Sequence, residues 1–79
     1  MSIEELKQKI LEVIAESTET DLELTEDTTL YEEMGLASVE AYVLLSDLEE
    51  EFGVRIPASA LRNVRTTGDL CSLVIRKMT

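Results

Sequence analysis

The amino-acid sequence predicts an all-α fold: a four-helix bundle with three main helices, one short third helix and a long first loop. Apolar residues recur every three or four positions in three separate segments, which is the spacing of amphipathic helices. Gly53 and Pro57 follow the middle segment, where they end one helix and prevent its continuation. The chain has 79 residues, 44% of them hydrophobic, and no internal repeat. We therefore expect a single small domain over residues 1–79.

The first predicted helix follows Ser2 and ends at about Ser17. Ser2 is placed to cap the first turn, and the acidic residues Glu4 and Glu5 suit the positive end of the helix dipole. The apolar residues at helical spacing are Ile3, Leu6, Ile10, Val13 and Ile14.

A long polar loop, residues 18–37, comes next. A loop of this length in a compact domain must be held by its own apolar side chains. The expected anchors are Leu22, Leu24, Leu30, Met34 and Leu36. We also expect a short helical turn within Thr29–Glu33, with Asp27 or Thr28 as its cap.

The second predicted helix spans Ser38–Phe52 and ends at Gly53, a residue suited to the left-handed conformation that closes helices. At about 100° per residue, one stripe forms its core face. That stripe consists of Ala41, Leu44, Leu45, Leu48 and Phe52. Val39 and Val43 fall on the opposite face, and Tyr42 lies on the flank shared with the first residue of the helix.

An extended link precedes Pro57, and the short third helix is predicted at Ala58–Arg62. The last helix begins at Thr66 or Thr67, because Thr66 and Asp69 have the spacing of a capping box with Asp in place of the preferred Glu. Its apolar face consists of Leu70, Leu73, Val74 and Met78, with Cys71 and Ile75 alongside.

Charge is unevenly distributed along the chain. Seven basic and seventeen acidic residues leave a net charge of −10, and fourteen acidic residues but no basic one lie between Lys9 and Arg55. Such a surface repels phosphate backbones and attracts basic protein patches, which excludes nucleic acid as a partner. The last third of the chain is basic by contrast, so we expect an electrically polar molecule.

Cysteine use and hydropathy indicate a cytoplasmic protein. The single cysteine, Cys71, cannot form an internal disulfide, and on an apolar helical face it is expected to be a small core residue. The first residues lack the charged start and apolar stretch of a secretory signal. The longest apolar run, Ala41 to Leu45, is far shorter than the roughly 18 residues that a membrane-spanning helix needs. We therefore expect no membrane insertion.

The residue types on which many enzymes depend are scarce. The chain has no histidine, which removes Ser–His and Cys–His nucleophile pairs and the usual mixed zinc sites. Its three glycines are isolated, so there is no glycine-rich phosphate loop. Paired carboxylates lie in a solvated acidic field, and the Asp-x-Asp spacing of a calcium loop is absent. The sequence predicts neither an enzyme nor a metal site.

Ser38 stands where the acidic loop ends and the second helix begins. By position alone it is a helix N-cap, a role worth about 1 kcal/mol. Its surroundings favour another interpretation, because Leu30–Glu40, the acidic helix that ends in glutamates and Phe52, and the pair Ile56 and Pro57 together resemble an acyl carrier protein. The family pattern is leucine-glycine-x-aspartate-serine-leucine followed by such a helix and an isoleucine-proline pair, and the spacing here matches it without a gap.

The resemblance implies a carrier rather than an enzyme. It makes Ser38 the attachment point of 4'-phosphopantetheine, transferred from coenzyme A by a separate phosphopantetheinyl transferase. The thiol of the arm would carry acyl intermediates as thioesters to fatty-acid, polyketide or related biosynthetic enzymes. We expect a monomer whose second helix meets basic patches on these enzymes, the alternative being a merely solvated acidic face. The expected docking residues are Val39, Glu40, Val43, Asp47, Glu49, Glu50 and Glu51.

Three departures from the family pattern indicate a specialised carrier. Ala37 replaces the usual aspartate before the serine, so a helix cap and a contact to the transferase are both lost. Arg62 and Arg65 make the third-helix region basic, and Tyr42 and Ser46 replace positions that are often aliphatic. Two alternatives stay open: an aminoacyl or peptidyl carrier, which shares the arm, and an acidic docking module whose serine is unmodified.

Overall fold

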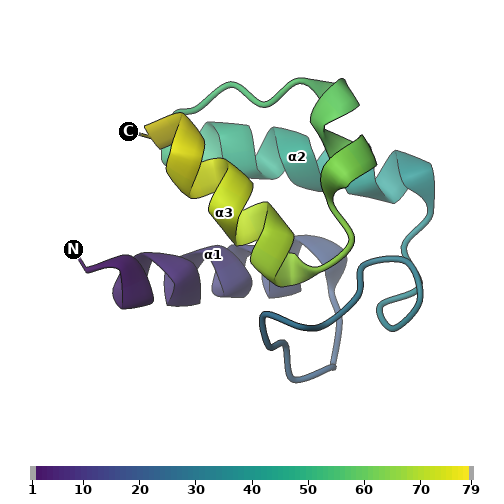
Figure 1. The fold of residues 1–79 in the computed structure, drawn as a ribbon. Helices are drawn as coiled ribbons and strands as arrows, with labels where there is room; N and C mark the ends of the chain where they lie inside the picture. Colours follow the sequence, from purple (N-terminus) through teal and green to yellow (C-terminus); the bar gives the residue numbers. More distant parts are fainter. Residues whose placement is uncertain (1, 79) are drawn as a thin grey trace.

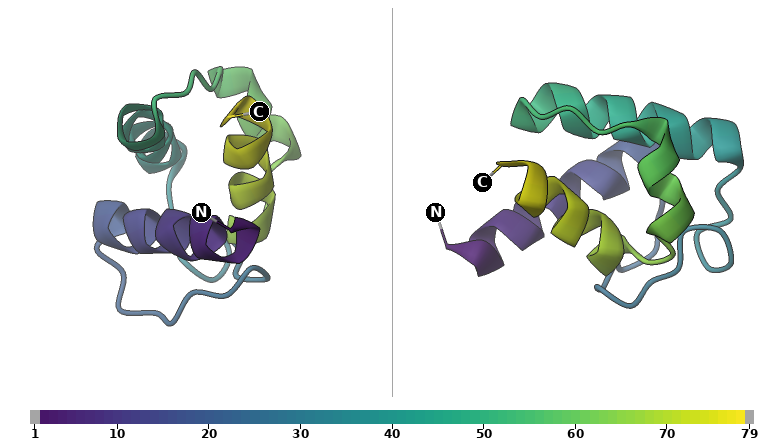
Figure 2. Two further views of the ribbon diagram at one scale, coloured as in Figure 1. Left: turned by 90° about the vertical axis from the view of Figure 1, so that its left-hand side faces the viewer. Right: turned by 45° about the horizontal axis from the view of Figure 1, so that its top comes forward.

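The computed structural model describes residues 2–78 and arranges them as the predicted all-α bundle (Figure 1). The described part contains α1 (Ile3–Thr18), α2 (Ser38–Phe52), the 3-10 helix η1 (Ala58–Asn63) and α3 (Thr67–Met78). Each α-helix contacts the other two. Seen along α2, the three α-helices surround one core, and η1 joins the end of α2 to α3 (Figure 2). Within residues 2–78, no helix combines the length and the hydrophobicity needed to cross a bilayer.

The helix ends follow local signals in the sequence. The Ser2 hydroxyl accepts a hydrogen bond from the Glu5 amide at 3.2 Å and so caps α1, which ends one residue later than predicted. The bounds of α2 are those predicted, with Gly53 in the left-handed conformation at φ 64°. At α3 the Asp69 amide donates to the Thr66 hydroxyl and the Thr66 amide donates to the Asp69 carboxylate, at 3.1 and 3.2 Å. The predicted capping box is therefore confirmed.

The core lies between the three α-helices. Its buried helical residues are Ile10, Ile14, Ala41, Leu44, Leu45, Leu48, Leu70, Cys71, Leu73 and Val74. The predicted apolar faces extend beyond this core at their ends: Ile3 is 61% exposed, Met78 is 45% exposed, and Phe52 is only half-buried. Helical periodicity assigns these residues to the correct face, but the neighbouring helices do not reach far enough to cover them.

The long loop, residues 19–37, is held by four of its five predicted anchors. Leu30 and Leu36 are buried and Leu24 and Met34 are half-buried, whereas Leu22 is 46% exposed and does not anchor the loop. The Leu30 amide also donates to the backbone carbonyl of Arg65 at 2.8 Å, so the loop is attached to the segment that leads into α3.

The turn predicted within Thr29–Glu33 is present, but its cap is not the predicted one. The Thr29 amide donates to the Glu33 carboxylate, and the Glu33 amide donates to the Thr29 hydroxyl, each at 3.0 Å. The cap is therefore Thr29 rather than Asp27 or Thr28, and the segment is a hydrogen-bonded turn rather than a helix. Thr28 is buried, and its hydroxyl accepts from the Thr25 amide instead.

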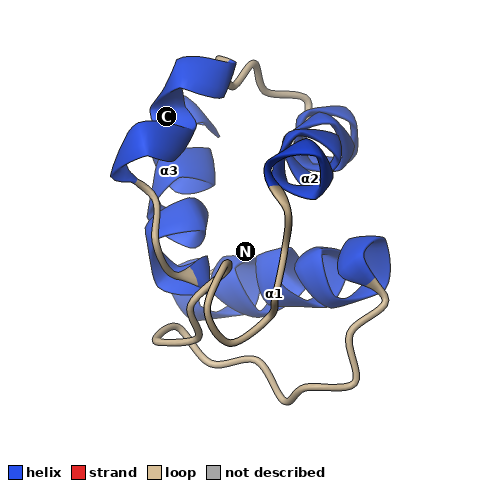
Figure 3. Ribbon diagram, turned by 90° about the vertical axis from the view of Figure 1, so that its right-hand side faces the viewer, coloured by secondary structure: helices blue, strands red, loops and turns tan. Residues whose placement is uncertain are grey.

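A second set of contacts holds the long loop, which runs below α1 in the view of Figure 3, against the first turn of α3. The Thr67 hydroxyl donates to the carbonyl of Thr25, and the Thr67 amide donates to the carbonyl of Thr28 at 2.9 Å. The Gly68 amide donates to the carbonyl of Glu26 at 2.9 Å. A Cβ atom at position 68 would lie 2.6 Å from that carbonyl oxygen, so glycine permits the close approach.

Candidate functional site

Ser38 is the first residue of α2 and does not cap it. The N-cap is Ala37, whose backbone is extended at φ −86° and ψ 162°. Ser38 is exposed, and within residues 2–78 its hydroxyl has no hydrogen-bond partner. The capping role that position alone assigns to Ser38 is therefore wrong, and the hydroxyl is available for other chemistry.

The chain entering α2 is held without a side-chain cap at position 37. The Glu40 carboxylate accepts a hydrogen bond from the Ala37 amide at 2.9 Å, which supplies one half of a capping box. Gly35 takes a left-handed conformation at φ 68°, which lets the chain turn before the helix. The buried side chain of Leu36 then anchors the segment in the core. These contacts set the place of Ser38 while leaving its hydroxyl unbound.

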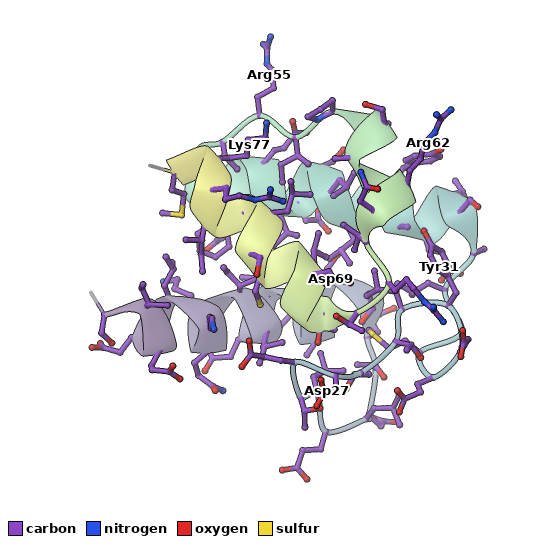
Figure 4. The ribbon with its side chains drawn as sticks, viewed as in Figure 1. Asp27, Tyr31, Arg55, Arg62, Asp69 and Lys77 are labelled. Atoms are coloured by element: carbon purple, nitrogen blue, oxygen red, sulfur yellow. The ribbon has the colours of Figure 1, made fainter. Side chains whose placement is uncertain are left out.

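A cavity of about 310 Å³ adjoins Ser38 between α2 and η1, and we call it the α2–η1 pocket. Its lining residues are Tyr31, Ser38, Tyr42, Ala58, Ser59, Leu61 and Arg62. In Figure 4, Tyr31 and Arg62 lie at the end of the molecule where α2 begins, whereas Arg55 projects from the link that follows α2. Tyr42 and Arg62 depart from the family pattern in the sequence, but that pattern does not place them in one cavity with Tyr31 and Ser59.

The outward face of α2 carries the predicted exposed apolar side chains. Val39 is 66% exposed and Val43 is 54% exposed, as expected from their position opposite the core. The carboxylates around them are not equivalent. Asp47 accepts a hydrogen bond from the Ser17 hydroxyl of α1, and Glu49 accepts one from the Ile56 amide at 2.7 Å. Two predicted docking carboxylates thus also hold the fold together, in addition to Glu40 at the helix start.

An acidic groove of about 340 Å³ lies between α1 and α2, and we call it the α1–α2 groove. Its lining residues are Val13, Glu16, Ser17, Asp47, Glu50 and Glu51. The predicted docking residues do not include Glu16, because they were chosen from α2 alone and Glu16 lies on the polar side of α1. Among the described residues, no group of three or more cysteines and carboxylates is arranged to hold a metal ion.

Cys71 takes no part in this site. Its side chain is fully buried in α3, and burial raises the pKa of the Cys71 thiol to about 11. A thiol with this pKa is almost entirely protonated at neutral pH and is a poor nucleophile. The expectation that Cys71 is a core residue is confirmed.

The fold and this site define a small helical carrier domain: one accessible hydroxyl at a helix start, a polar pocket beside it, and an acidic face. Comparison with known proteins agrees. The family model described as a phosphopantetheine attachment site matches residues 8–74. The acyl carrier protein of Lactobacillus acidophilus is 33% identical over 75 residues, covering 94% of both chains.

Two further comparisons extend this result. The bikaverin polyketide synthase of Gibberella fujikuroi is 35% identical over 69 residues, covering 87% of this chain and 3% of the synthase. The solved structure of an acyl carrier protein from Thermotoga maritima superposes with a TM-score of 0.78 and 32% sequence identity, covering 99% of this chain and 92% of that one.

The chain belongs to the phosphopantetheine attachment site family and is an acyl carrier protein, which carries acyl groups on covalently bound 4'-phosphopantetheine. The residues present suit that group. Ser38 offers an exposed hydroxyl without a hydrogen-bond partner within residues 2–78, and the adjoining pocket is lined by Arg62, a cation that can pair with a phosphate.

Proposed function

We propose that Ser38 is the residue to which 4'-phosphopantetheine is attached, and that the chain carries cargo without catalysing its conversion. The observation behind this proposal is the exposed Ser38 hydroxyl, which has no hydrogen-bond partner within residues 2–78. Its oxygen would form the phosphodiester bond as the pyrophosphate of coenzyme A breaks, releasing adenosine 3',5'-bisphosphate, while a base on the transferase takes the serine proton. When bound, the arm supplies a terminal thiol that holds acyl groups as thioesters.

Intact mass after incubation with coenzyme A and a phosphopantetheinyl transferase tests the attachment. We expect a gain of one arm in the native protein and none in Ser38→Ala. Ser59→Ala is the matched control, because Ser59 is the other serine of the same pocket and is also exposed. A gain that persists in Ser38→Ala, or a native protein that several transferases leave unmodified, would contradict the proposal, and the latter result would favour an unmodified docking module.

We further propose that Ala37 makes this chain a poor substrate for general transferases. An aspartate at this position would cap α2 and offer a carboxylate next to the serine, and the N-cap is Ala37 here. Ala37→Asp should raise the rate of modification by a general transferase and stabilise the fold by about 1 kcal/mol. A stabilised variant with an unchanged modification rate would show that the aspartate acts on the helix alone.

The outward face of α2, with the α1–α2 groove beside it, is the proposed docking surface for basic patches on synthases and transferases. Glu50 and Glu51 are exposed and line the groove, and Val39 and Val43 are exposed apolar side chains nearer the start of the same helix. Charge attraction of this kind speeds transient encounters without making them tight. It suits a carrier that must leave each enzyme after delivery.

Transfer of cargo to a partner enzyme at several salt concentrations tests this surface. We expect the rate to fall as ionic strength rises, and Glu50→Lys to slow transfer at low salt. Glu12→Lys is the control, since it makes the same charge change on an exposed position of α1 outside the groove. Glu49→Lys is a poorer probe, because it also removes the acceptor of the Ile56 amide. Equal rates in both variants and at all salt concentrations would refute electrostatic docking.

The cargo and setting are also proposals. The likeness to a segment of a polyketide synthase and to discrete acyl carriers supports fatty or polyketide acyl groups rather than aminoacyl groups as the cargo, in fatty-acid, polyketide or related biosynthesis by a cytoplasmic monomer. Loading of the modified protein by acyl and aminoacyl ligases, followed by mass, tests this assignment. Efficient aminoacylation without acylation would assign the chain to the peptidyl carriers instead.

A further inference from the structure

Arg62 borders the same cavity as the Ser38 hydroxyl. Both side chains line the α2–η1 pocket, whose volume is about 310 Å³. Arg62 is exposed, and its guanidinium has no hydrogen bond or ion pair within residues 2–78. Arg65, its neighbour along the chain, is instead paired with Glu32 at 3.1 Å. A cation without a partner among the described residues therefore lines the same pocket as the hydroxyl that we propose is modified.

The other walls of the pocket suit an uncharged chain that contains amide groups. Tyr31 is 41% exposed and Tyr42 is 49% exposed, so their phenol groups can donate and accept hydrogen bonds while their rings offer apolar faces. Ser59 adds a third hydroxyl group. None of the described lining residues is acidic, although the chain has a net charge of −10. Glu40 lies two residues from both Ser38 and Tyr42 on α2, and its carboxylate accepts a hydrogen bond from the Ala37 amide before the helix.

We infer that the α2–η1 pocket binds the protein-proximal part of the 4'-phosphopantetheine arm, with Arg62 paired with the phosphodiester and Tyr31 and Tyr42 in contact with the pantetheine chain. The inference rests on the proposed attachment at Ser38, which places the phosphorus one bond from the serine oxygen. A phosphodiester carries one negative charge, and the planar guanidinium can bind two phosphate oxygens through parallel N–H bonds.

Arg62 is solvent-exposed, so the pairing should bias the arm rather than lock it. Exposed ion pairs shift an equilibrium by about two- to fivefold, and we expect a shift of this size between the docked and the free arm. The α2–η1 pocket and the α1–α2 groove share no lining residue. A basic partner held on the groove would therefore leave the pocket accessible, and the arm would be delivered from a defined side of α2.

Proton NMR of the modified protein tests the inference through the geminal methyl groups of the arm. We expect nuclear Overhauser effects between these methyls and the ring protons of Tyr31 and Tyr42. Arg62→Gln should weaken them by up to about fivefold, and Arg62→Lys should give an intermediate effect, because lysine keeps the charge but not the fork. Arg55→Gln is the matched control, since it removes the same charge from an exposed position outside the pocket.

The outcomes separate this inference from the proposed function. A mass gain at Ser38 together with tyrosine contacts that weaken in Arg62→Gln but not in Arg55→Gln supports the docked arm. A mass gain at Ser38 without tyrosine contacts, or with equal contacts in both glutamine variants, overturns the docked arm and leaves the attachment standing. A protein that takes up no arm at Ser38 contradicts both. Far-UV circular dichroism of each variant confirms that the helices are intact before the contacts are compared.

Discussion

Replacing Gly68 by alanine sets two physical effects of opposite sign against each other. Alanine stabilises a helix interior by about 1 kcal/mol relative to glycine, so propensity alone predicts a more stable α3. The new Cβ, however, would lie 2.6 Å from the carbonyl oxygen of Glu26, a backbone atom that cannot rotate away. To relieve that clash, the loop that contains Glu26 must move away from the first turn of α3. Three hydrogen bonds join the two segments, from the Thr67 hydroxyl, the Thr67 amide and the Gly68 amide.

Each of these bonds contributes about 1 kcal/mol net. Their loss, less the gain in helix propensity, gives a net destabilisation of about 2 kcal/mol in Gly68→Ala. For a domain of this size the melting temperature should fall by about 8 to 16 °C, as measured by far-UV circular dichroism. Ser72→Ala, on the exposed side of the same helix, should change stability by less than about 0.5 kcal/mol. A melting temperature that rises in Gly68→Ala would refute the reasoning, because it would mean that the loop yields at no cost.

Three other substitutions probe single contacts. Glu49→Ala should lower the free energy of unfolding, measured in urea, by about 1 to 3 kcal/mol, because it leaves the Ile56 amide without its acceptor. Glu49→Gln keeps an acceptor and should keep most of the stability. Equal losses in both variants would contradict this. Two backbone amides before α3 hold the pKa of Asp69 below its usual range, so its stabilising effect is present above about pH 4 and is lost as the pH falls through the lowered pKa. Asp69→Asn should therefore flatten the fall of melting temperature in acid, and identical acid profiles would argue against the assignment. Ser17→Ala should cost about 0.5 to 1.5 kcal/mol by removing the hydroxyl that joins α1 to Asp47, and an unchanged urea midpoint would show that this contact is energetically neutral.

Features set by neighbouring residues could be predicted from the sequence. The bounds of α2 follow from Gly53 and from the spacing of its apolar stripe, and the start of α3 follows from the Thr66 and Asp69 pair. The cap of the loop turn was misassigned because Asp27, Thr28 and Thr29 are all good caps. Only the fold decides that Thr28 is turned inward.

Contacts between distant segments could not be predicted in this way. Arg62 and Arg65 cannot be distinguished in the sequence. In the fold, Arg65 forms an ion pair with Glu32, whereas Arg62 lines the same pocket as Ser38. The sequence likewise predicts Glu49 as a surface docking residue. Its hydrogen bond with the Ile56 amide forms only because the link after α2 folds back alongside the helix. The candidate serine was found from sequence, whereas the pocket beside it required the structure.

The burial of Cys71 bears on how long cargo stays loaded. A thioester exchanges its acyl group with any thiolate that can reach it, and a carrier with a second reactive thiol could transfer cargo from its arm to its own body. Here the only cysteine of the chain is fully buried, with a thiol pKa of about 11. The Cys71 sulfur is therefore not accessible to the thioester, and at neutral pH it is almost entirely in the protonated thiol form. The burial that makes Cys71 part of the core therefore also keeps the acyl group on the arm until a partner enzyme removes it.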